Sequence, residues 1–284
     1  MQVSTALVLW TVPVFLVLSA VEWIDYRRDP DKPDNAFSVR DSAGNWATYL
    51  LNALIKLVGH YVLPFSVIVV VGALTPLHLS PNRWWVWVAA LVITDFCYYW
   101  GHRGDHRIRL LWVAHSVHHS STYFNMSTNL RLPWLHPVSY TVRSLAWLPA
   151  ALLGFPAWMI FLLNTVGLIF QIHCHTERVG KLWRPYEFVF NTPSHHRVHH
   201  GSNPCYIDKN YGGLFIIWDR LFGSYAEEIE PVRYGLIHDS NTDNPLKHNY
   251  FETLAMLRDL AHARTWHDRL GHVFGPPRWK GLPT

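Results

Sequence analysis

Long stretches without charge are the feature that most constrains what this chain can fold into. Residues 5–21 carry no charge, and residues 46–79 carry Lys56 as their single fixed charge. In residues 132–176 the only charged residue is Arg143. About 20 apolar residues suffice for a helix to cross the hydrocarbon core of a bilayer. The sequence therefore predicts an all-α polytopic membrane protein with about four to five transmembrane helices.

Two further features refine the predicted spans. Residues 83–100, RWWVWVAALVITDFCYYW, have aromatic side chains at both ends, as helices do where they meet the two membrane interfaces. Gly154 and Pro156 divide residues 132–176 into two apolar pieces, which predicts a helical hairpin. A secretory signal peptide is the alternative for the first stretch, but the leading residues MQVST lack the positive charge of such a peptide.

Loop charges predict the orientation of the chain. By the positive-inside rule, the histidine-rich segments and the C-terminus are expected in the cytoplasm and the N-terminus outside. The formal net charge of +4 is interpreted as this cytoplasmic bias, and nucleic-acid binding is not expected. The basic residues that support the orientation follow the predicted spans, and they are Arg27, Arg28, Lys32, Arg40, Arg103, Arg107, Arg109, Lys181 and Arg184.

This topology divides the chain into four parts. Residues 1–101 are predicted to form transmembrane helices, and residues 102–131 hold the first and second histidine motifs on the cytoplasmic side. Residues 132–174 are predicted to form a transmembrane helical hairpin, and residues 175–284 a cytoplasmic cap with the last histidine motif and the C-terminal tail. Within the cap, residues 250–270 are predicted to form one amphipathic helix, either at the membrane interface or on the soluble surface.

Histidines are concentrated in the middle of the chain, where 12 of the 19 fall between His102 and His200. Residues three and four apart lie on one face of a helix, so each HxxHH motif is expected to direct three imidazoles toward one point. The nine predicted metal ligands are His102, His106, His115, His118, His119, His175, His196, His199 and His200.

Nine imidazoles exceed the needs of a single metal ion. One tetrahedral site takes about four protein ligands, so the set predicts two metal sites with an open position for a small molecule. Imidazole suits iron, zinc, copper and nickel, whereas the HExxH motif of zinc proteases is absent. A metal pair at a membrane surface predicts O₂-dependent oxidation of a lipid C–H bond. The alternative class is a metal-ion transporter, whose ligands would lie midway along the spans.

Several polar residues are candidates for supporting roles. Asp95 lies seven residues before His102, nearly two helical turns, and is predicted to orient a ligand histidine through its other ring nitrogen. A helix cap or a helix–helix hydrogen bond is the alternative for Asp95. Asn125, Thr128 and Arg131 recur at helical spacing and are predicted to line the site or to bind polar substrate groups, with a solvated helix face as the alternative.

Three segments resemble a known family. They are DFCYYWGHRGDH (95–106), HSVHHSSTYFNMSTNLR (115–131) and NTPSHHRVHHGSNPCYIDKNYGGLFIIWDRLFGSY (191–225), and they are similar to the fatty acid hydroxylase / sterol desaturase superfamily. The resemblance implies a non-haem di-iron centre at the cytoplasmic membrane face, held by the three histidine motifs. It also implies that His175 is a further ligand from an intermediate motif, whose first position is occupied here by Gln171.

Within the superfamily, the third segment is most similar to the alkylglycerol monooxygenases, which cleave ether lipids and use tetrahydrobiopterin. Glu177 matches those enzymes and, by this resemblance, is a candidate catalytic residue together with Asp95, Asn125 and Arg131. Arg107 stands where the first motif of those enzymes has Glu, which points instead to the broader bacterial sterol-desaturase-like group.

The predicted activity is hydroxylation or desaturation of a membrane lipid of the sterol, fatty-acyl or ether-lipid class, with pterin-dependent ether-lipid cleavage as the alternative. Two iron ions and O₂ are the expected cofactors, and zinc could replace iron in a purified sample. Because the chain has no GxGxxG motif for a nucleotide, electrons are expected from NAD(P)H through an electron-transfer protein, or from tetrahydrobiopterin.

Overall fold

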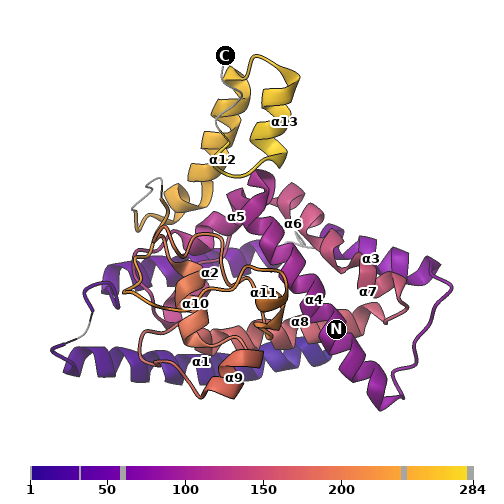
Figure 1. Cartoon of the computed structure of the whole chain (residues 1–284), viewed down its shortest axis with the longest axis horizontal. Coiled ribbons are helices and arrows are strands. Elements are labelled where there is room, and N and C mark those ends of the chain that lie inside the picture. The colour runs from indigo at the N-terminus through magenta and orange to yellow at the C-terminus, as the bar shows by residue number, and fades with distance from the viewer. Residues whose placement is uncertain (1, 32, 58–61, 238–241, 280–284) are drawn as a thin grey trace.

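The computed structural model describes residues 2–31, 33–57, 62–237 and 242–279. These residues form helices joined by turns, and within them the structure has no named strand. Among these residues, one isolated antiparallel bridge joins Phe190 to Phe215. The predicted all-helical class is therefore confirmed for the described part of the chain (Figure 1).

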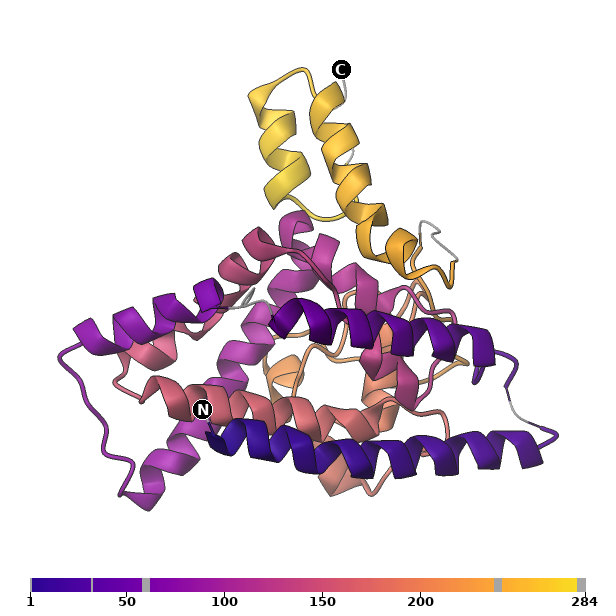
Figure 2. The ribbon, with the colours of Figure 1, turned by 180° about the vertical axis from the view of Figure 1, so that it is seen from behind.

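The helices fall into a long-helix body and a projecting C-terminal hairpin (Figures 1 and 2). α1 packs along α8, while α4 contacts both α5 and α8. In chain order the elements are α1 (Gln2–Arg28), α2 (Val39–Leu57), α3 (Val62–Leu74), α4 (Trp84–Arg107), α5 (Arg109–His119), η1 (Met126–Leu130), α6 (Pro137–Ser144), η2 (Leu145–Trp147), α7 (Leu148–Leu152), α8 (Ala157–Phe170), η3 (Gln171–Cys174), α9 (Arg184–Val189), α10 (Pro193–His200), α11 (Ile217–Leu221), α12 (Pro245–His262) and α13 (Trp266–Phe274).

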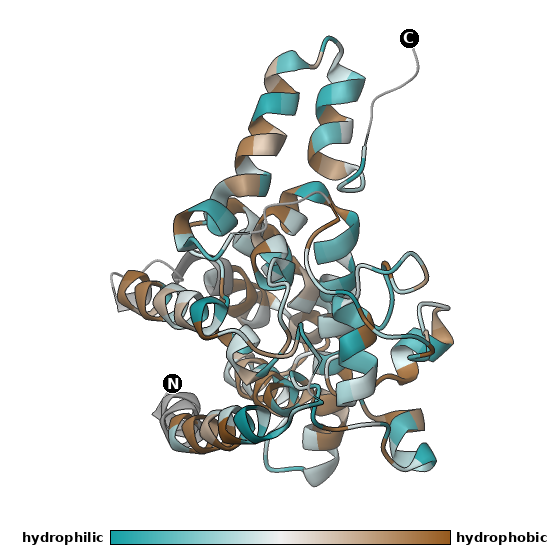
Figure 3. Ribbon diagram, turned by 90° about the vertical axis from the view of Figure 1, so that its left-hand side faces the viewer, coloured by the Kyte–Doolittle hydropathy of each residue, from teal (hydrophilic) through white to brown (hydrophobic). Residues whose placement is uncertain are grey.

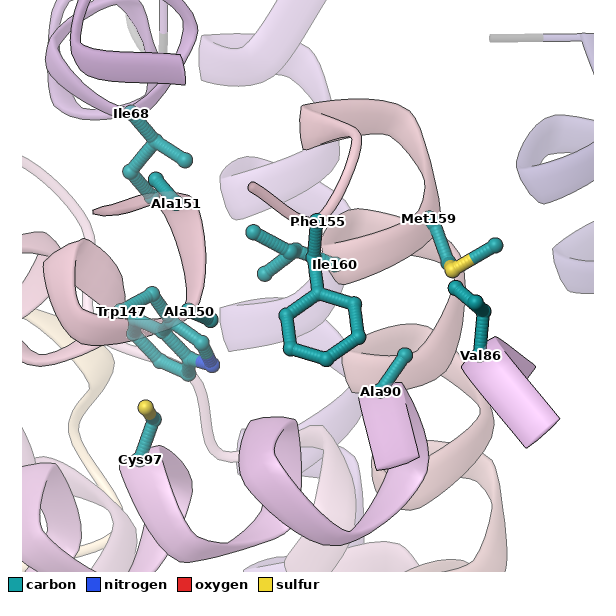
Figure 4. Close-up of a cluster of buried hydrophobic side chains, with 10 residues drawn as sticks. All are labelled: Ile68, Val86, Ala90, Cys97, Trp147, Ala150, Ala151, Phe155, Met159 and Ile160. Atoms are coloured by element: carbon teal, nitrogen blue, oxygen red, sulfur yellow. The ribbon is translucent and has the colours of Figure 1, made fainter. Parts of the chain in front are cut away.

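The largest apolar core cluster lies where α3, α4, η2, α7 and α8 meet (Figure 4). Small side chains on α4, such as Ala90, allow close approach of the neighbouring helices, and large ones such as Phe155 fill the space between them. The cluster consists of Ile68, Val86, Ala90, Cys97, Trp147, Ala150, Ala151, Phe155, Met159 and Ile160. This packing fixes α4, which carries the first histidine motif.

The break between α7 and α8 falls where the sequence placed it, at Gly154 and Pro156. Gly154 has a φ of +88°, and a Cβ at this position would lie 2.5 Å from the backbone oxygen of Leu77. Gly154 O also accepts a hydrogen bond from Leu79 N at 2.9 Å. Only glycine combines this conformation with such close backbone contact.

One helical stretch in the described part of the chain, Ala157–Cys174, is long and apolar enough to cross a membrane. α1 also presents apolar residues outward, and Val14, Val17 and Val21 are each more than half exposed. Figure 3 shows this hydrophobic character along α1, beside the N label. The predicted apolar stretch 46–79 is divided between α2 and α3, and residues 58–61 lie outside the described part.

The prediction of one helix over residues 250–270 is wrong. α12 ends at His262 and α13 begins at Trp266, so the segment forms a hairpin. Thr265 starts the second helix, because its hydroxyl accepts a hydrogen bond from Asp268 N at 3.0 Å. This local cap outweighs the apolar periodicity that runs through the break. Arg109 of α5 pairs with Asp259 at 2.6 Å and anchors the hairpin to the body.

Candidate metal centre

Three helices carry the histidine motifs, and local sequence signals position them. α4 and α5 are separated only by Ile108, which is extended (φ −120°, ψ 116°). This break lets α5 pack against α4 and brings the first two motifs together. α10 begins after Thr192, whose side chain accepts a hydrogen bond from His195 N, and Pro193 occupies its first turn. Every residue of α10 is buried.

The structure brings all nine predicted ligands together, in two groups. Within each group the candidate ligand atoms lie within 4.8 Å of one another. The larger group has five members, and the smaller group has four. The larger group is His102, His106, His115, His119 and His199, and the smaller group is His118, His175, His196 and His200.

The expectation that each HxxHH motif points toward a single site is wrong. In both motifs the first and last histidines, which are four residues apart, belong to one group. The middle histidine, His118 or His199, belongs to the other group. Residues i and i+4 differ by about 40° around a helix, whereas i+3 lies about 100° from i+4. Each motif therefore contributes to both groups and lies between them.

In the larger group the inward nitrogens are close enough to share one ion. His102 Nε2 lies 3.0 Å from His115 Nε2, which lies 3.1 Å from His119 Nε2. Two nitrogens bound at right angles, each about 2.1 Å from one ion, would lie about 3.0 Å apart. His106 Nε2 and His199 Nε2 are buried and have no hydrogen-bond partner among the described residues. A metal ion fits this donor set.

The smaller group has the same spacing. His175 Nε2 lies 3.1 Å from His118 Nε2 and 3.0 Å from His196 Nε2. His200 Nε2 is buried without a partner in the described part of the chain. His175 Nδ1 lies 3.1 Å from the backbone oxygen of Gln171, an arrangement that places the ring proton on Nδ1 and leaves the Nε2 lone pair facing the group.

Backbone carbonyls orient two rings of the larger group in the same way. His102 Nδ1 lies 2.8 Å from Tyr211 O, and His199 Nδ1 lies 3.1 Å from Lys209 O. A ligand histidine commonly donates a hydrogen bond from its second ring N–H to such an acceptor, which holds its tautomer and orientation. Sequence reasoning missed these carbonyls, because main-chain atoms leave no residue-type signal.

Burial keeps the imidazoles neutral. Burial, with the neighbouring His199, lowers the pKa of His118 to about 3. Burial likewise lowers the pKa of His199 to about 4, and it lowers the pKa of His102, His115 and the other ligands well below the ordinary value. Neutral imidazole is the form that binds a metal ion, so the groups are already in the ligating state at pH 7.

A cavity of about 980 Å³ borders both groups. His115 of the larger group lines it, as do His118 and His175 of the smaller group. Most other walls are apolar, with contributions from α1, α2, α5 and α8 that include Val12, Phe15, Trp46, Leu111, Leu168 and Ile169. A cavity of this size and character suits an alkyl chain.

Comparison with known proteins agrees with this geometry. Residues 87–224 match the family described as fatty acid hydroxylase, and this segment contains all nine histidines of the two groups. Residues 87–224 of the chain belong to the fatty acid hydroxylase family. No solved structure matches the chain.

Several curated relatives of this fatty acid hydroxylase domain act on lipids according to their names. Alkylglycerol monooxygenase of Danio rerio is 47% identical over 170 residues, 58% of this chain and 36% of that protein. Alkylglycerol monooxygenase of Homo sapiens is 39% identical over 198 residues, 69% of this chain and 43% of that protein. Ornithine lipid hydroxylase of Rhizobium tropici is 30% identical over 162 residues, 54% of this chain and 46% of that protein. The chain spans less than half the length of these relatives.

In the fatty acid hydroxylase domain, Asp95 has partners other than the predicted histidine. Its carboxylate accepts hydrogen bonds from Leu214 N at 2.8 Å, Phe215 N at 3.1 Å and Trp218 Nε1 at 2.9 Å. Asp95 therefore fixes the loop that follows α10 and does not contact a ligand ring directly. The sequence could not show this, because the loop residues lie more than a hundred positions away.

Asp219 holds the same loop from the other side. It accepts hydrogen bonds from Tyr211 N at 2.8 Å, Gly212 N at 2.7 Å and Ser224 Oγ at 2.7 Å. Burial raises the pKa of Asp219 to about 6. Since Tyr211 supplies the carbonyl that faces His102, the two acids position this candidate ligand through the backbone.

Asn125, Thr128 and Arg131 serve the scaffold around η1. Asn125 and Thr128 form a reciprocal capping box at the start of η1. Arg131 is buried, pairs with Asp41 at 2.6 Å and donates to Asn45 Oδ1 at 2.7 Å. In the described part of the chain none of the predicted three lines the cavity. Their regular spacing reflects local capping and a buried ion pair.

Glu177 lies in a polar network next to the smaller group. It accepts a hydrogen bond from the Tyr234 hydroxyl and lies 3.7 Å from Arg197 Nε. Arg197 also binds both carboxylate oxygens of Glu228, each at 2.7 Å. The network ties the segment that follows His175 to α10.

Arg107, where the sequence departs from the alkylglycerol monooxygenase pattern, faces Asp208. The two side chains are 3.5 Å apart, and the other oxygen of Asp208 lies 3.9 Å from His106 Nδ1. Asp208 has a φ of +61°, a conformation that non-glycine residues seldom adopt. Arg107 and Asp208 thus border the larger group on its outer side.

The histidines that we did not expect to be ligands lie outside both groups where they are described. His173 Nδ1 contacts Phe170 O, and His195 Nδ1 lies 3.2 Å from Thr192 Oγ1. His60 and His238 lie outside the described residues. The others absent from the groups are His78, His136, His248, His262, His267 and His272.

Proposed function

We propose that this protein is a membrane-bound, O₂-dependent di-iron oxidoreductase that hydroxylates or desaturates a lipid. The observation that carries the proposal is the pair of adjoining histidine groups on the wall of one large apolar cavity. Membership of the fatty acid hydroxylase superfamily supports lipid oxidation as the reaction class.

The nine histidines would hold two iron ions, five around one and four around the other. A bound iron pair would supply the activation of O₂ and the oxidation of an unactivated C–H bond. The protein contributes neutral imidazoles, and the carbonyls of Tyr211, Lys209 and Gln171 hold three of these rings in place. His115, His118 and His175 line the cavity, so a substrate carbon there would lie beside both groups.

The apolar walls would bind the alkyl part of the lipid and exclude water from the reacting carbon. We propose a multi-pass membrane protein with its active site and C-terminus on the cytoplasmic side, and lateral entry of the lipid from the bilayer. The exposed apolar faces of α1 and α8 are consistent with this placement. An electron-transfer protein or tetrahydrobiopterin would deliver the electrons.

A second candidate is ether-lipid cleavage with a pterin, and it is favoured by the identity to the alkylglycerol monooxygenases. Arg107 and its contact with Asp208 distinguish this chain from the pattern of those enzymes. Oxidation of a 1-O-alkylglycerol by the purified protein, with and without tetrahydrobiopterin, separates the two candidates. Metal-ion transport, the other class that we considered, would instead appear as metal uptake into proteoliposomes.

The proposal is tested with the full chain purified from membranes and loaded anaerobically with Fe(II). We expect about two iron ions per chain and changed membrane lipids in cells that produce the protein. His118→Ala should lose iron from the smaller group and abolish the lipid change, whereas His262→Ala, at an exposed position on α12, should retain both. Absence of iron together with unchanged lipids in the wild type would contradict the proposal.

A further inference from the structure

Arg143 is the one charged residue in the apolar segment 132–176, and its side chain lines the cavity. Its Nε lies 2.7 Å from Asp105 Oδ2, and Asp105 lines the same cavity. The two side chains are only 14% and 12% exposed. An ion pair in such a place is costly to desolvate and seldom contributes net stability. This suggests that the pair serves a ligand.

The site is built to receive the guanidinium. A Cβ on Gly101 would lie 1.8 Å from Arg143 Nη1, so only glycine lets the group lie against α4. The aromatic rings of Tyr98 and Trp147 lie 5.4 Å and 4.5 Å from the guanidinium carbon. These contacts hold Arg143 beside the turn of α4 that carries His102.

Unpaired polar atoms line the same cavity. Arg143 Nη1 and Trp147 Nε1 are buried donors without an acceptor among the described residues, and Asn164 Oδ1 is a buried acceptor without a donor there. All three side chains line the cavity. Buried polar groups of native proteins are nearly always hydrogen-bonded, so the two donors call for a ligand oxygen and the amide oxygen calls for a ligand hydroxyl or a water molecule.

The charge of the pair restricts the ligand. Asp105 balances Arg143, so the subsite offers hydrogen-bond donors with no net charge. Because the pair is neutral overall, it gives a carboxylate or phosphate no net attraction to offset the cost of removing that anion from water. A hydroxyl, ether or ester carbonyl oxygen accepts hydrogen bonds at a much lower desolvation cost.

We propose that Arg143 and Asp105 form a polar subsite that binds an uncharged oxygen function of the lipid substrate. The subsite holds that end of the lipid beside the larger histidine group, while the alkyl chain follows the apolar walls. This inference rests on the proposed function, because it takes the cavity to be the lipid site. It narrows the substrate to neutral lipids with an oxygen function near the oxidised carbon.

The test measures binding and needs no turnover. Radiolabelled dodecanol is bound to the full-length protein in lipid nanodiscs, and unlabelled dodecanol, dodecane and dodecanoate compete for it. We expect dodecanol to compete at least tenfold better than either of the other two. Arg143→Met combined with Asp105→Leu removes both charges together and leaves no unpaired ion. The preference for dodecanol over dodecane should fall at least tenfold in this double variant. Each probe partitions into the nanodisc equally with either protein, so comparing the preference of the variant with that of the wild type removes the effect of partition.

The matched control removes another Arg–Asp pair. Arg40 and Asp243 lie 2.9 Å apart, outside the cavity lining, and Arg40→Met with Asp243→Leu should leave the preference unchanged. Equal binding of the three probes by the wild type would overturn the subsite, as would tighter binding of dodecanoate or a preference that survives in the double variant. The wild-type comparison decides the matter even if the double variant does not fold. The assay measures binding and does not require catalysis. A negative result would therefore overturn the polar subsite without contradicting the proposed oxidase activity.

Discussion

At the scale of the residue, the main feature is a set of imidazoles kept neutral inside the protein. Their inward nitrogens approach to about 3 Å, and carbonyls such as Tyr211 O hold the outward nitrogens. Without a metal, these bare nitrogens face one another and cannot all find donors. This donor set fits a metal ion, and holding the nitrogens together without one is unfavourable for the fold.

The lowered pKa values predict that the metal-free protein is unstable in acid. The unfolded chain takes up protons near pH 6.5, whereas buried His118 and His199 resist protonation to about pH 3 and pH 4. The unfolded state therefore binds more protons below pH 6.5, and the free energy of unfolding falls as the pH falls. Each such histidine lowers the free energy of unfolding by up to about 1.4 kcal/mol for each pH unit of acidification. Denaturant unfolding of the metal-free protein at pH 7, 6 and 5 should show this loss, and a flat profile would contradict it.

Asp219 offers a second prediction at this scale. Asp219→Ala leaves the buried Tyr211 N and Gly212 N without their acceptor. Each unpaired donor should lower the free energy of unfolding by about 1–3 kcal/mol. The shifted loop also releases the carbonyl that orients His102, so metal affinity should fall about tenfold or more. Thermal unfolding and iron content at limiting Fe(II) measure the two effects. The control is Glu227→Ala, at an exposed position. Normal iron retention in Asp219→Ala would show that the loop does not orient the His102 ring.

At the scale of the element, helix breaks decide how the chain is arranged. Ile108 separates α4 from α5, Gly154 lies between α7 and α8, and Thr265 starts α13. Each break has a local cause: an extended residue, a positive φ or a side-chain cap. The break at Gly154 was visible in the sequence because glycine and proline interrupt an apolar run. The break before Thr265 was missed, because apolar periodicity continued through it.

Gly154→Ala should destabilise the α7–α8 turn. The residue has a φ of +88°, and its new Cβ would lie 2.5 Å from Leu77 O, so we expect a loss of roughly 2 kcal/mol. Gly167→Ala in α8 is the matched control. Apart from its chain neighbours and the backbone of its own helix, no described atom lies within 4 Å of its new Cβ, and alanine favours the helix by up to about 1 kcal/mol. Thermal unfolding in detergent should lower the melting temperature only for Gly154→Ala, and equal melting of the two variants would refute the argument.

At the scale of the whole molecule, the cavity and the histidine groups arise together. α5 contributes to both, because His115 and His118 face the groups while Leu111 and Ala114 face the cavity. α1, α2 and α8 close the other sides, although they are distant from α5 in the chain. The fold therefore places apolar walls directly beside the candidate ligands.

Ala114→Phe tests whether the cavity is the substrate site. The added ring would fill space beside His115 and His118, so lipid oxidation should fall by about tenfold or more while iron content stays unchanged. Product formation and iron are measured on the same preparation. Ala261→Phe, at an exposed position of α12, is the control for the substitution. Undiminished oxidation by Ala114→Phe would place the substrate elsewhere.

The sequence by itself determined the helical class and the nine histidines that come together. The clustering of histidines identifies candidate ligands, and apolar runs identify helices, because both depend only on neighbours in the chain. The tertiary structure alone decided that each HxxHH motif contributes to two groups, that Asp95 and Asp219 hold the loop of Tyr211, and that Arg143 meets Asp105 in the cavity. These facts depend on helix packing and on main-chain partners far away in the chain, which no local pattern encodes.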